Sequence, residues 1–116
     1  MDVQQETFEI EVKIHTIPKA FDFLWRIAEV IRVKPTAFNV QLYPIITGEG
    51  GCGLTAILFF VVSFCIIDSW PESRYVNVNI VSCKPFSRLQ VEIVIQAFIE
   101  REERKNGQIE IDFGKE

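Results

Sequence analysis

The sequence predicts a two-layer α+β domain, in which an antiparallel sheet has both helices on one face. Three observations favour this class. The chain has 116 residues, 48% of them hydrophobic, which suits one domain with a single core. Short stretches of alternating hydrophobic and polar residues are interspersed with two stretches of helical spacing. The expected element order is β-α-β-β-β-α-β. Antiparallel strand pairs with both helices on one face of the sheet are consistent with this order.

The first half of the chain predicts two strands around a helix. Hydrophobic and polar residues alternate over residues 8–14, as in a strand with one face in water. Pro18 suits a helix start, and apolar residues at helical spacing predict a helix over 18–33, ended by Pro35. Alternation over 38–43 predicts the second strand. His15 is expected to be an ordinary residue at the end of the first strand.

A glycine-rich loop and a long apolar run follow. Residues 47–53 contain no lysine and precede a strand rather than a helix, so a hairpin connection is favoured over a phosphate-binding loop. Leu54 to Ile67 is the longest apolar run. A membrane-spanning helix needs about 20 residues, and the run is rich in β-branched and aromatic residues, so we expect one buried strand.

The second half predicts a turn, a strand, a helix and a last strand. Pro71 and Ser73 mark the turn, residues 76–80 alternate, and Pro85 starts the helix. The expected core face of this helix is Val91, Val94, Ile95 and Phe98. The charged residues 100–105 are expected to be a solvated helix end, capped by Asn106-Gly107. Residues 109–113 alternate as a final strand.

The predicted sheet has one face that a single chain cannot cover. The run Leu54–Ile67 is apolar on both sides, which is typical of strands buried on both faces. Both helices are expected on the same face. A second copy of the sheet is the simplest cover for the other face, so the sequence predicts a face-to-face homodimer.

Composition argues against several classes of protein. The net charge is -4 with no basic stripe, which disfavours nucleic-acid binding. The acidic start lacks the features of a signal peptide, and a cytoplasmic protein with no membrane contact is expected. The number of cysteines is odd and no CxxC occurs, so Cys52, Cys65 and Cys83 are expected to be free thiols. A single histidine disfavours a metal site.

Five residues stand out as candidates for chemistry. Ser63 is a lone hydroxyl inside the apolar run, Asp68 and Glu72 flank Trp70-Pro71, and Cys83 closes the strand after the turn. Each has an ordinary interpretation taken singly, because small residues in cores and polar residues at strand ends are common.

Together they resemble a known pattern. The short, prokaryotic-type S-adenosylmethionine decarboxylase proenzymes carry a serine in an apolar strand, a histidine five residues later, a Trp-Pro-Glu, and a cysteine fifteen residues beyond the histidine. In this sequence Ser63, Trp70-Pro71-Glu72 and Cys83 match at that spacing. Asp68 replaces the histidine, and Val62 replaces the glutamate before the serine. The resemblance is close over residues 58–86 and architectural elsewhere.

The resemblance implies an activity and a role for each residue. The chain would cleave itself between Val62 and Ser63, and Ser63 would become a pyruvoyl group that acts as the electron sink for decarboxylation. Cys83 would reprotonate the carbanion. Asp68 would stand in for the histidine that assists cleavage, and Trp70 and Glu72 would bind substrate. A carboxylate is a weaker base than imidazole, so slow or absent cleavage is expected unless burial strengthens Asp68 as a base.

The sequence leaves three functional classes open. The first is a decarboxylase acting on S-adenosylmethionine in polyamine synthesis, or on a related amino acid such as arginine. The second is a non-catalytic homologue that keeps the fold, and the third an unrelated small ligand-binding or dimerisation domain. A simple hairpin turning near Trp70 would place Cys83 opposite Phe60, about 10 Å from Ser63. Either the strand register differs from this simple hairpin, or Cys83 contributes to the site of a partner subunit. The resemblance favours the second interpretation, because that family builds its sites where two protomers meet.

Overall fold

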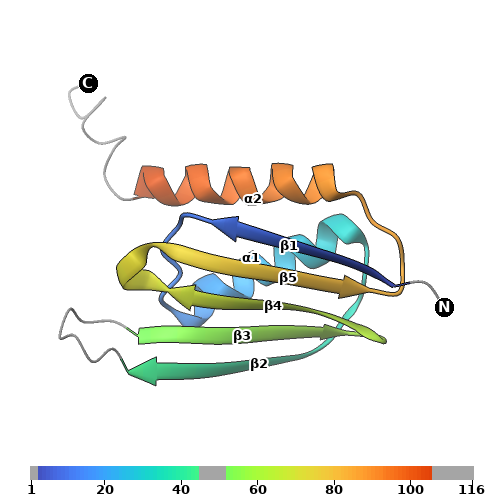
Figure 1. The fold of residues 1–116 in the computed structure, drawn as a ribbon, viewed down its shortest axis with the longest axis horizontal. Helices are drawn as coiled ribbons and strands as arrows, with labels where there is room; N and C mark the ends of the chain where they lie inside the picture. Colours follow the sequence, from blue (N-terminus) through green and yellow to red (C-terminus); the bar gives the residue numbers. More distant parts are fainter. Residues whose placement is uncertain (1–2, 45–51, 106–116) are drawn as a thin grey trace.

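The computed structural model describes residues 3–44 and 52–105 of the chain. It confirms the predicted α+β class, with a five-stranded antiparallel sheet and two helices (Figure 1). The sheet order is β1-β5-β4-β3-β2. The elements are β1 (Gln4–Ile10), α1 (Ile17–Ile31), β2 (Pro35–Pro44), β3 (Cys52–Phe60), β4 (Ser63–Trp70), the 3₁₀ turn η1 (Pro71–Ser73), β5 (Tyr75–Ser82) and α2 (Arg88–Glu103).

The long apolar run forms two strands rather than the predicted single strand. Phe60 pairs with Ser63, so only Val61 and Val62 connect β3 to β4. The prediction of one strand over Leu54–Ile67 is therefore wrong. Both strands lie inside the sheet and need apolar side chains, and the turn contains none of the glycine, proline or asparagine residues that usually indicate one. The described element order becomes β-α-β-β-β-β-α, and the expected cap at 106–107 and strand at 109–113 lie outside the described residues.

The first strand lies earlier than its alternating pattern predicted. β1 ends at Ile10, although Val12 and Ile14 continue the pattern as fully buried side chains in the connection to α1. His15 therefore lies just before the helix instead of at a strand end. Burial, followed by the nearby Lys19 and Lys13, lowers the pKa of His15.

Local caps fix the boundaries of the helices. The Thr16 hydroxyl accepts a hydrogen bond from the Lys19 amide at the start of α1, and Arg32 ends the helix in the left-handed conformation, three residues before Pro35. The Ser87 hydroxyl likewise accepts from the Gln90 amide at the start of α2. These are the usual ways in which the unpaired groups of helix ends are satisfied.

The core lies between α1 and one face of the sheet, and α2 packs beside α1 along β1 (Figure 1). Phe23 of α1 and Phe98 of α2 meet edge to face, with 4.9 Å between ring centroids. Glu102 corrects the prediction of a wholly solvated charged end, because it is only 3% exposed. The Lys19 ammonium lies 2.9 Å from its carboxylate and compensates the buried charge.

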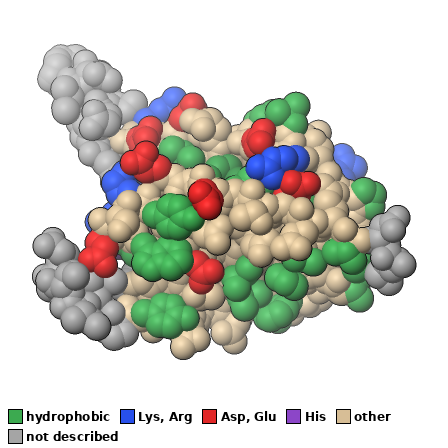
Figure 2. All heavy atoms as spheres, viewed as in Figure 1, with side chains coloured by type: hydrophobic (Ala, Val, Ile, Leu, Met, Phe, Trp, Pro, Cys, Tyr) green, Lys and Arg blue, Asp and Glu red, His purple; other side chains and the backbone are tan. Residues whose placement is uncertain are grey.

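The opposite face of the sheet carries no helix in the described part of the chain. Alternation and register place Ile57, Phe59, Phe64, Ile66 and Val81 together on this open face. Phe59 is 39% exposed. Figure 2 views this face, and its hydrophobic side chains gather mainly toward the right, with a smaller group at the left. Neither described helix is long and apolar enough to cross a membrane.

Candidate active site

The bond between Val62 and Ser63 lies in an exposed and strained turn. Ser63 begins β4 and is 9% exposed, whereas the side chain of Val62 is 74% exposed. Val62 has a φ of 58°, in the left-handed region that favours glycine. A β-branched residue there costs about 1–2 kcal/mol. The chain therefore holds this peptide bond at the surface in a conformation that is unfavourable for its own side chain.

Cys83 lies directly against this turn. Its backbone amide donates a hydrogen bond of 3.1 Å to the Ser63 hydroxyl oxygen. Its thiol lies 3.4 Å from the carbonyl oxygen of Val62 and donates to it. A hydroxyl, the carbonyl that precedes it and a thiol thus converge on one peptide bond. Of the residues predicted for the site, Ser63 and Cys83 are the two that a single chain brings to this bond.

The strand register explains this proximity. Pro71 to Arg74 form a four-residue connection, with Arg74 at a φ of 50°, and Trp70 pairs with Tyr75. The pairing then continues to Phe64 opposite Val81. The expectation that Cys83 lies opposite Phe60 is therefore wrong. The register differs from a simple hairpin, and no partner subunit is needed to bring Cys83 to Ser63.

Asp68 lies away from this site. It is five residues along β4 from Ser63, which corresponds to about 16 Å, and an odd separation places the two side chains on opposite faces. The Thr55 hydroxyl donates a hydrogen bond of 2.6 Å to the Asp68 carboxylate, and the Tyr43 hydroxyl lies 3.2 Å from the same threonine oxygen. Asp68 therefore belongs to a polar cluster on the open face.

Trp70 and Glu72 lie at the same end of β4 as Asp68. The Trp70 side chain is 46% exposed, and its ring centroid lies 5.5 Å from that of Tyr75. Glu72 is exposed within η1. The predicted site residues thus form two groups in one chain, with Ser63 and Cys83 at one end of β4 and Asp68, Trp70 and Glu72 at the other.

A hollow of about 420 Å³ adjoins the Val62–Ser63 bond. Its lining consists of Arg32, Val33, Lys34, Val61, Val62, Ser63, Cys83 and Lys84. The Lys84 ammonium donates a hydrogen bond of 3.3 Å to the carbonyl of Arg32. Sequence reasoning missed the three cations. Lys84 is the neighbour of Cys83 in sequence, which is a usable signal, but Arg32 and Lys34 reach the site only through the end of α1.

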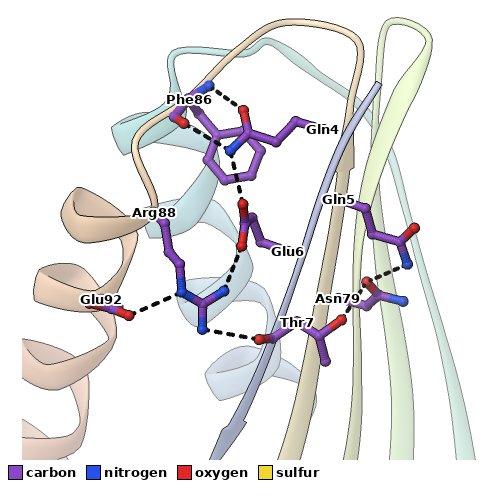
Figure 3. A network of polar contacts seen from close by, with 8 residues as sticks. All are labelled: Gln4, Gln5, Glu6, Thr7, Asn79, Phe86, Arg88 and Glu92. Atoms are coloured by element: carbon purple, nitrogen blue, oxygen red, sulfur yellow. Dashed lines mark hydrogen bonds and ion pairs between the residues drawn. The ribbon is translucent and has the colours of Figure 1, made fainter. Parts of the chain in front are cut away.

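A polar network fixes the segment that follows Cys83 (Figure 3). The Gln4 side chain accepts a hydrogen bond of 2.9 Å from the Phe86 amide and donates one of 3.0 Å to its carbonyl. Arg88 donates to Glu6 at 2.6 Å and to the carbonyl of Thr7 at 3.3 Å. These bonds tie β1 to the start of α2 and so hold the backbone that follows Cys83.

The described residues include two free thiols, Cys65 and Cys83, which differ in burial. Cys65 is a free, fully buried thiol, and burial raises its pKa far above the ordinary value. Cys83 is also free and only partly buried. The side chain of Cys52 is outside the described part. Within residues 3–44 and 52–105, no three histidine, cysteine, aspartate or glutamate side chains gather as a metal site would require.

Comparison with known proteins identifies a structural relative. No family model matches the sequence, and no curated protein matches it. Among solved structures, the chain is similar to an adenosylmethionine decarboxylase from Aquifex aeolicus. The superposition has a TM-score of 0.60 at 12% identity and covers 87% of this chain and 79% of that one. The chain therefore has the fold of an adenosylmethionine decarboxylase.

Proposed function

We propose that the chain is a pyruvoyl-dependent decarboxylase of the S-adenosylmethionine decarboxylase type, acting on S-adenosylmethionine or a related amino acid. One observation carries the proposal. The Ser63 hydroxyl, the Val62 carbonyl and the Cys83 thiol converge on one strained, exposed turn. The similarity in fold to an adenosylmethionine decarboxylase supports it.

The residues at the turn suit self-cleavage. The Ser63 oxygen adds to the Val62 carbonyl carbon, and the carbon–nitrogen bond breaks to give an ester. Elimination then releases the Val62 carboxylate, and hydrolysis with loss of ammonia leaves a ketone on residue 63. The Cys83 thiol donates to the carbonyl oxygen on which negative charge develops, which is the position where a donor stabilises the transition state. Strain at Val62 is relieved when the turn opens.

The pyruvoyl ketone supplies an electron sink for loss of carbon dioxide when it reacts with an amine. The Cys83 thiol lies beside residue 63 and returns a proton to the product carbon. Trp70 and Glu72 contact the substrate, in keeping with the family resemblance. Because they lie with Asp68 at the far end of β4, a second copy of the chain has to bring them to Ser63.

A homodimer formed through the open faces of two chains provides that second copy. We propose a cytoplasmic location for this dimer. Phe59 and its neighbours form an apolar patch on this face that no described helix covers. Pairing two such faces removes apolar surface from water. It also turns Asp68, on the same face, toward the partner.

A non-catalytic homologue is the second candidate. The observation that favours it is the environment of Asp68, where the family has a histidine. The Thr55 hydroxyl already donates to this carboxylate at 2.6 Å. A carboxylate engaged in such a bond is a poor replacement for an imidazole that moves protons near neutral pH. Under this proposal the chain keeps the fold and stays whole.

Intact-mass measurement of the purified protein tests the proposal. Because Asp68 replaces the family's histidine, we expect slow cleavage into two fragments, the second beginning with a blocked pyruvoyl residue 63, and a single uncut chain for Ser63→Ala. Ser69→Ala is a matched control, because Ser69 is a buried serine of the same strand that donates to the Ile14 carbonyl. It should be cut normally. An uncut natural chain after prolonged incubation, or decarboxylation by an uncut chain, would contradict the pyruvoyl mechanism.

A further inference from the structure

The hollow beside the Val62–Ser63 bond carries charge of one sign. In the described part of the chain its charged lining residues are Arg32, Lys34 and Lys84, with no carboxylate beside them. They come from the end of α1, the connection to β2 and the segment after Cys83. The whole chain has a net charge of -4, so this clustering does not follow from overall composition. None of the ion pairs in the described residues involves these three side chains.

A structural role accounts for only one of the three cations. Lys84 donates to the Arg32 carbonyl at the C-terminal end of α1, where a positive charge is favourable. Among residues 3–44 and 52–105, no hydrogen bond or ion pair engages the side chains of Arg32 and Lys34, which are both exposed. Three like charges around one hollow repel one another, and a bound anion relieves that repulsion.

The size and lining of the hollow suit a small molecule with an anionic end. A volume of about 420 Å³ is within the range of small-molecule sites, and Val33, Val61 and Val62 give it an apolar wall. Ser63 and Cys83 lie in the same lining. A substrate held there would place its anionic group on the cations while its amine reaches residue 63.

We propose that this hollow binds the side-chain carboxylate of an acidic amino acid, which is the substrate class of the enzyme. The assignment of a substrate rests on the proposed function, whereas anion binding does not. A sulfonium or guanidinium substrate would bring a positive charge to three others, and like-charge contacts oppose binding. A dicarboxylic amino acid meets the cations with its second carboxylate and leaves the reacting carboxylate near the apolar wall.

Binding to an uncleavable chain tests the site without any need for catalysis. Calorimetry on the Ser63→Ala protein should show that it binds succinate, a dicarboxylate without an amine. The same measurement should show no binding of putrescine, a dication. Lys34→Gln and Arg32→Gln should each raise the succinate Kd about fivefold, the effect of one charge at about 4 Å in water. Arg26→Gln is the matched control, because Arg26 is an exposed cation of α1 paired with Asp22. It should leave the Kd unchanged.

Carbon dioxide release from cleaved natural protein then tests the substrate class. We expect release from aspartate or glutamate at least tenfold faster than from S-adenosylmethionine or arginine. Preference for S-adenosylmethionine would overturn this inference and leave the proposed function intact. An uncut chain that binds succinate through Lys34 and Arg32 would support the anion site while the proposed function fails. Absence of succinate binding, or binding that ignores both substitutions, would overturn the site itself.

Discussion

The two ends of β4 differ in the face of the sheet to which their side chains point and in what those side chains contact. At its start, Ser63 points to the core side of the sheet, the turn before it is strained, and Cys83 contacts both the hydroxyl and the carbonyl. Toward its end, Asp68 points to the open face and accepts a hydrogen bond from Thr55. The first end brings a hydroxyl, the carbonyl before it and a thiol into contact. The second end holds a carboxylate that already accepts a hydrogen bond, about 16 Å from Ser63.

This difference indicates which of the predicted site residues could act together within one chain. Residues that share one strand at an odd separation lie on opposite faces, so Ser63 and Asp68 of one chain cannot act on the same atom. A site that uses both has to take one end from each of two chains. In the proposed dimer the open faces meet, and because the Ser63 side chain points to the core side, the partner's Asp68 would have to approach the Val62–Ser63 bond at the exposed turn.

The largest change in cleavage rate is expected when Asp68, near the C-terminal end of β4, is replaced by histidine. Asp68→His should speed cleavage at Ser63 by about 10²–10⁴-fold, the usual contribution of general acid–base assistance. To learn which chain supplies the group, a chain carrying both Asp68→His and Ser63→Ala is co-expressed with the natural chain. Mass spectrometry then follows cleavage of the natural chain alone.

Faster cleavage of the natural chain in the mixed dimer would place the two ends of β4 in one site built from two subunits. If Asp68→His accelerates cleavage only of the chain that carries it, the arrangement across two chains is wrong. If it accelerates nothing and the chain stays whole, the non-catalytic candidate gains support.

The elements that the sequence predicted well are those set by local chemistry. The helix expected at 18–33 is α1, because apolar spacing, Pro18 and its cap agree. The strand at 76–80 lies within β5. The run Leu54–Ile67 was misjudged because hydrophobicity marks burial and not direction. Val61 and Val62 give no local sign of reversing the chain, and the fold imposes the left-handed conformation on Val62 against its preference.

A second prediction concerns what joins two chains. Phe59 lies on the apolar half of the open face, and a charge there opposes pairing of two such faces. Phe59→Glu should weaken the dimer about 100-fold or more, because its exposed ring area is lost from the interface on both chains. Sedimentation equilibrium measures the change. Leu89→Glu is the control, since Leu89 belongs to α2 rather than to the sheet and is 64% exposed. Dimers that survive Phe59→Glu, or a monomeric natural protein, would rule out this interface.

The third prediction tests the strain at the first end of β4. In an uncleavable Ser63→Ala chain, Val62→Gly should raise the free energy of unfolding by about 0.5–1 kcal/mol, because relief of a left-handed β-branched residue exceeds the entropic cost of glycine. Val61→Gly, at the neighbouring turn residue, which does not have a positive φ, should lower it. Urea unfolding compares the two. Equal losses for both substitutions would mean that Val62 is not strained.

The site was harder to predict than the fold for a physical reason. Ser63, Asp68 and Cys83 were recognisable from spacing, but spacing carries no information on which face a residue occupies until the strand and its register are known. A connection of four residues after Trp70, instead of a tight turn, brought Cys83 to Ser63. Arg32 and Lys34 were not predictable at all, because only the packing of α1 on the sheet carries them to the turn.

The smallest effect is expected where the Cys83 segment is tied to β1. Arg88, and then Gln4, hydrogen-bond to Glu6 and lower its pKa below the ordinary carboxyl value. A lowered folded-state pKa contributes stability above the ordinary pKa of about 4.5, and that contribution is lost as the pH falls through the folded value. Glu6→Gln should therefore reduce the unfolding free energy slightly at pH 7, and the difference from the natural chain should close toward pH 3. Glu92→Gln removes the other, more exposed partner of Arg88, so it should change less at pH 7. A Glu6→Gln deficit that persists at pH 3 would mean that the side chain acts through packing rather than through its charge, and the segment after Cys83 would then be held to β1 by Gln4 and by the bond from Arg88 to the Thr7 carbonyl.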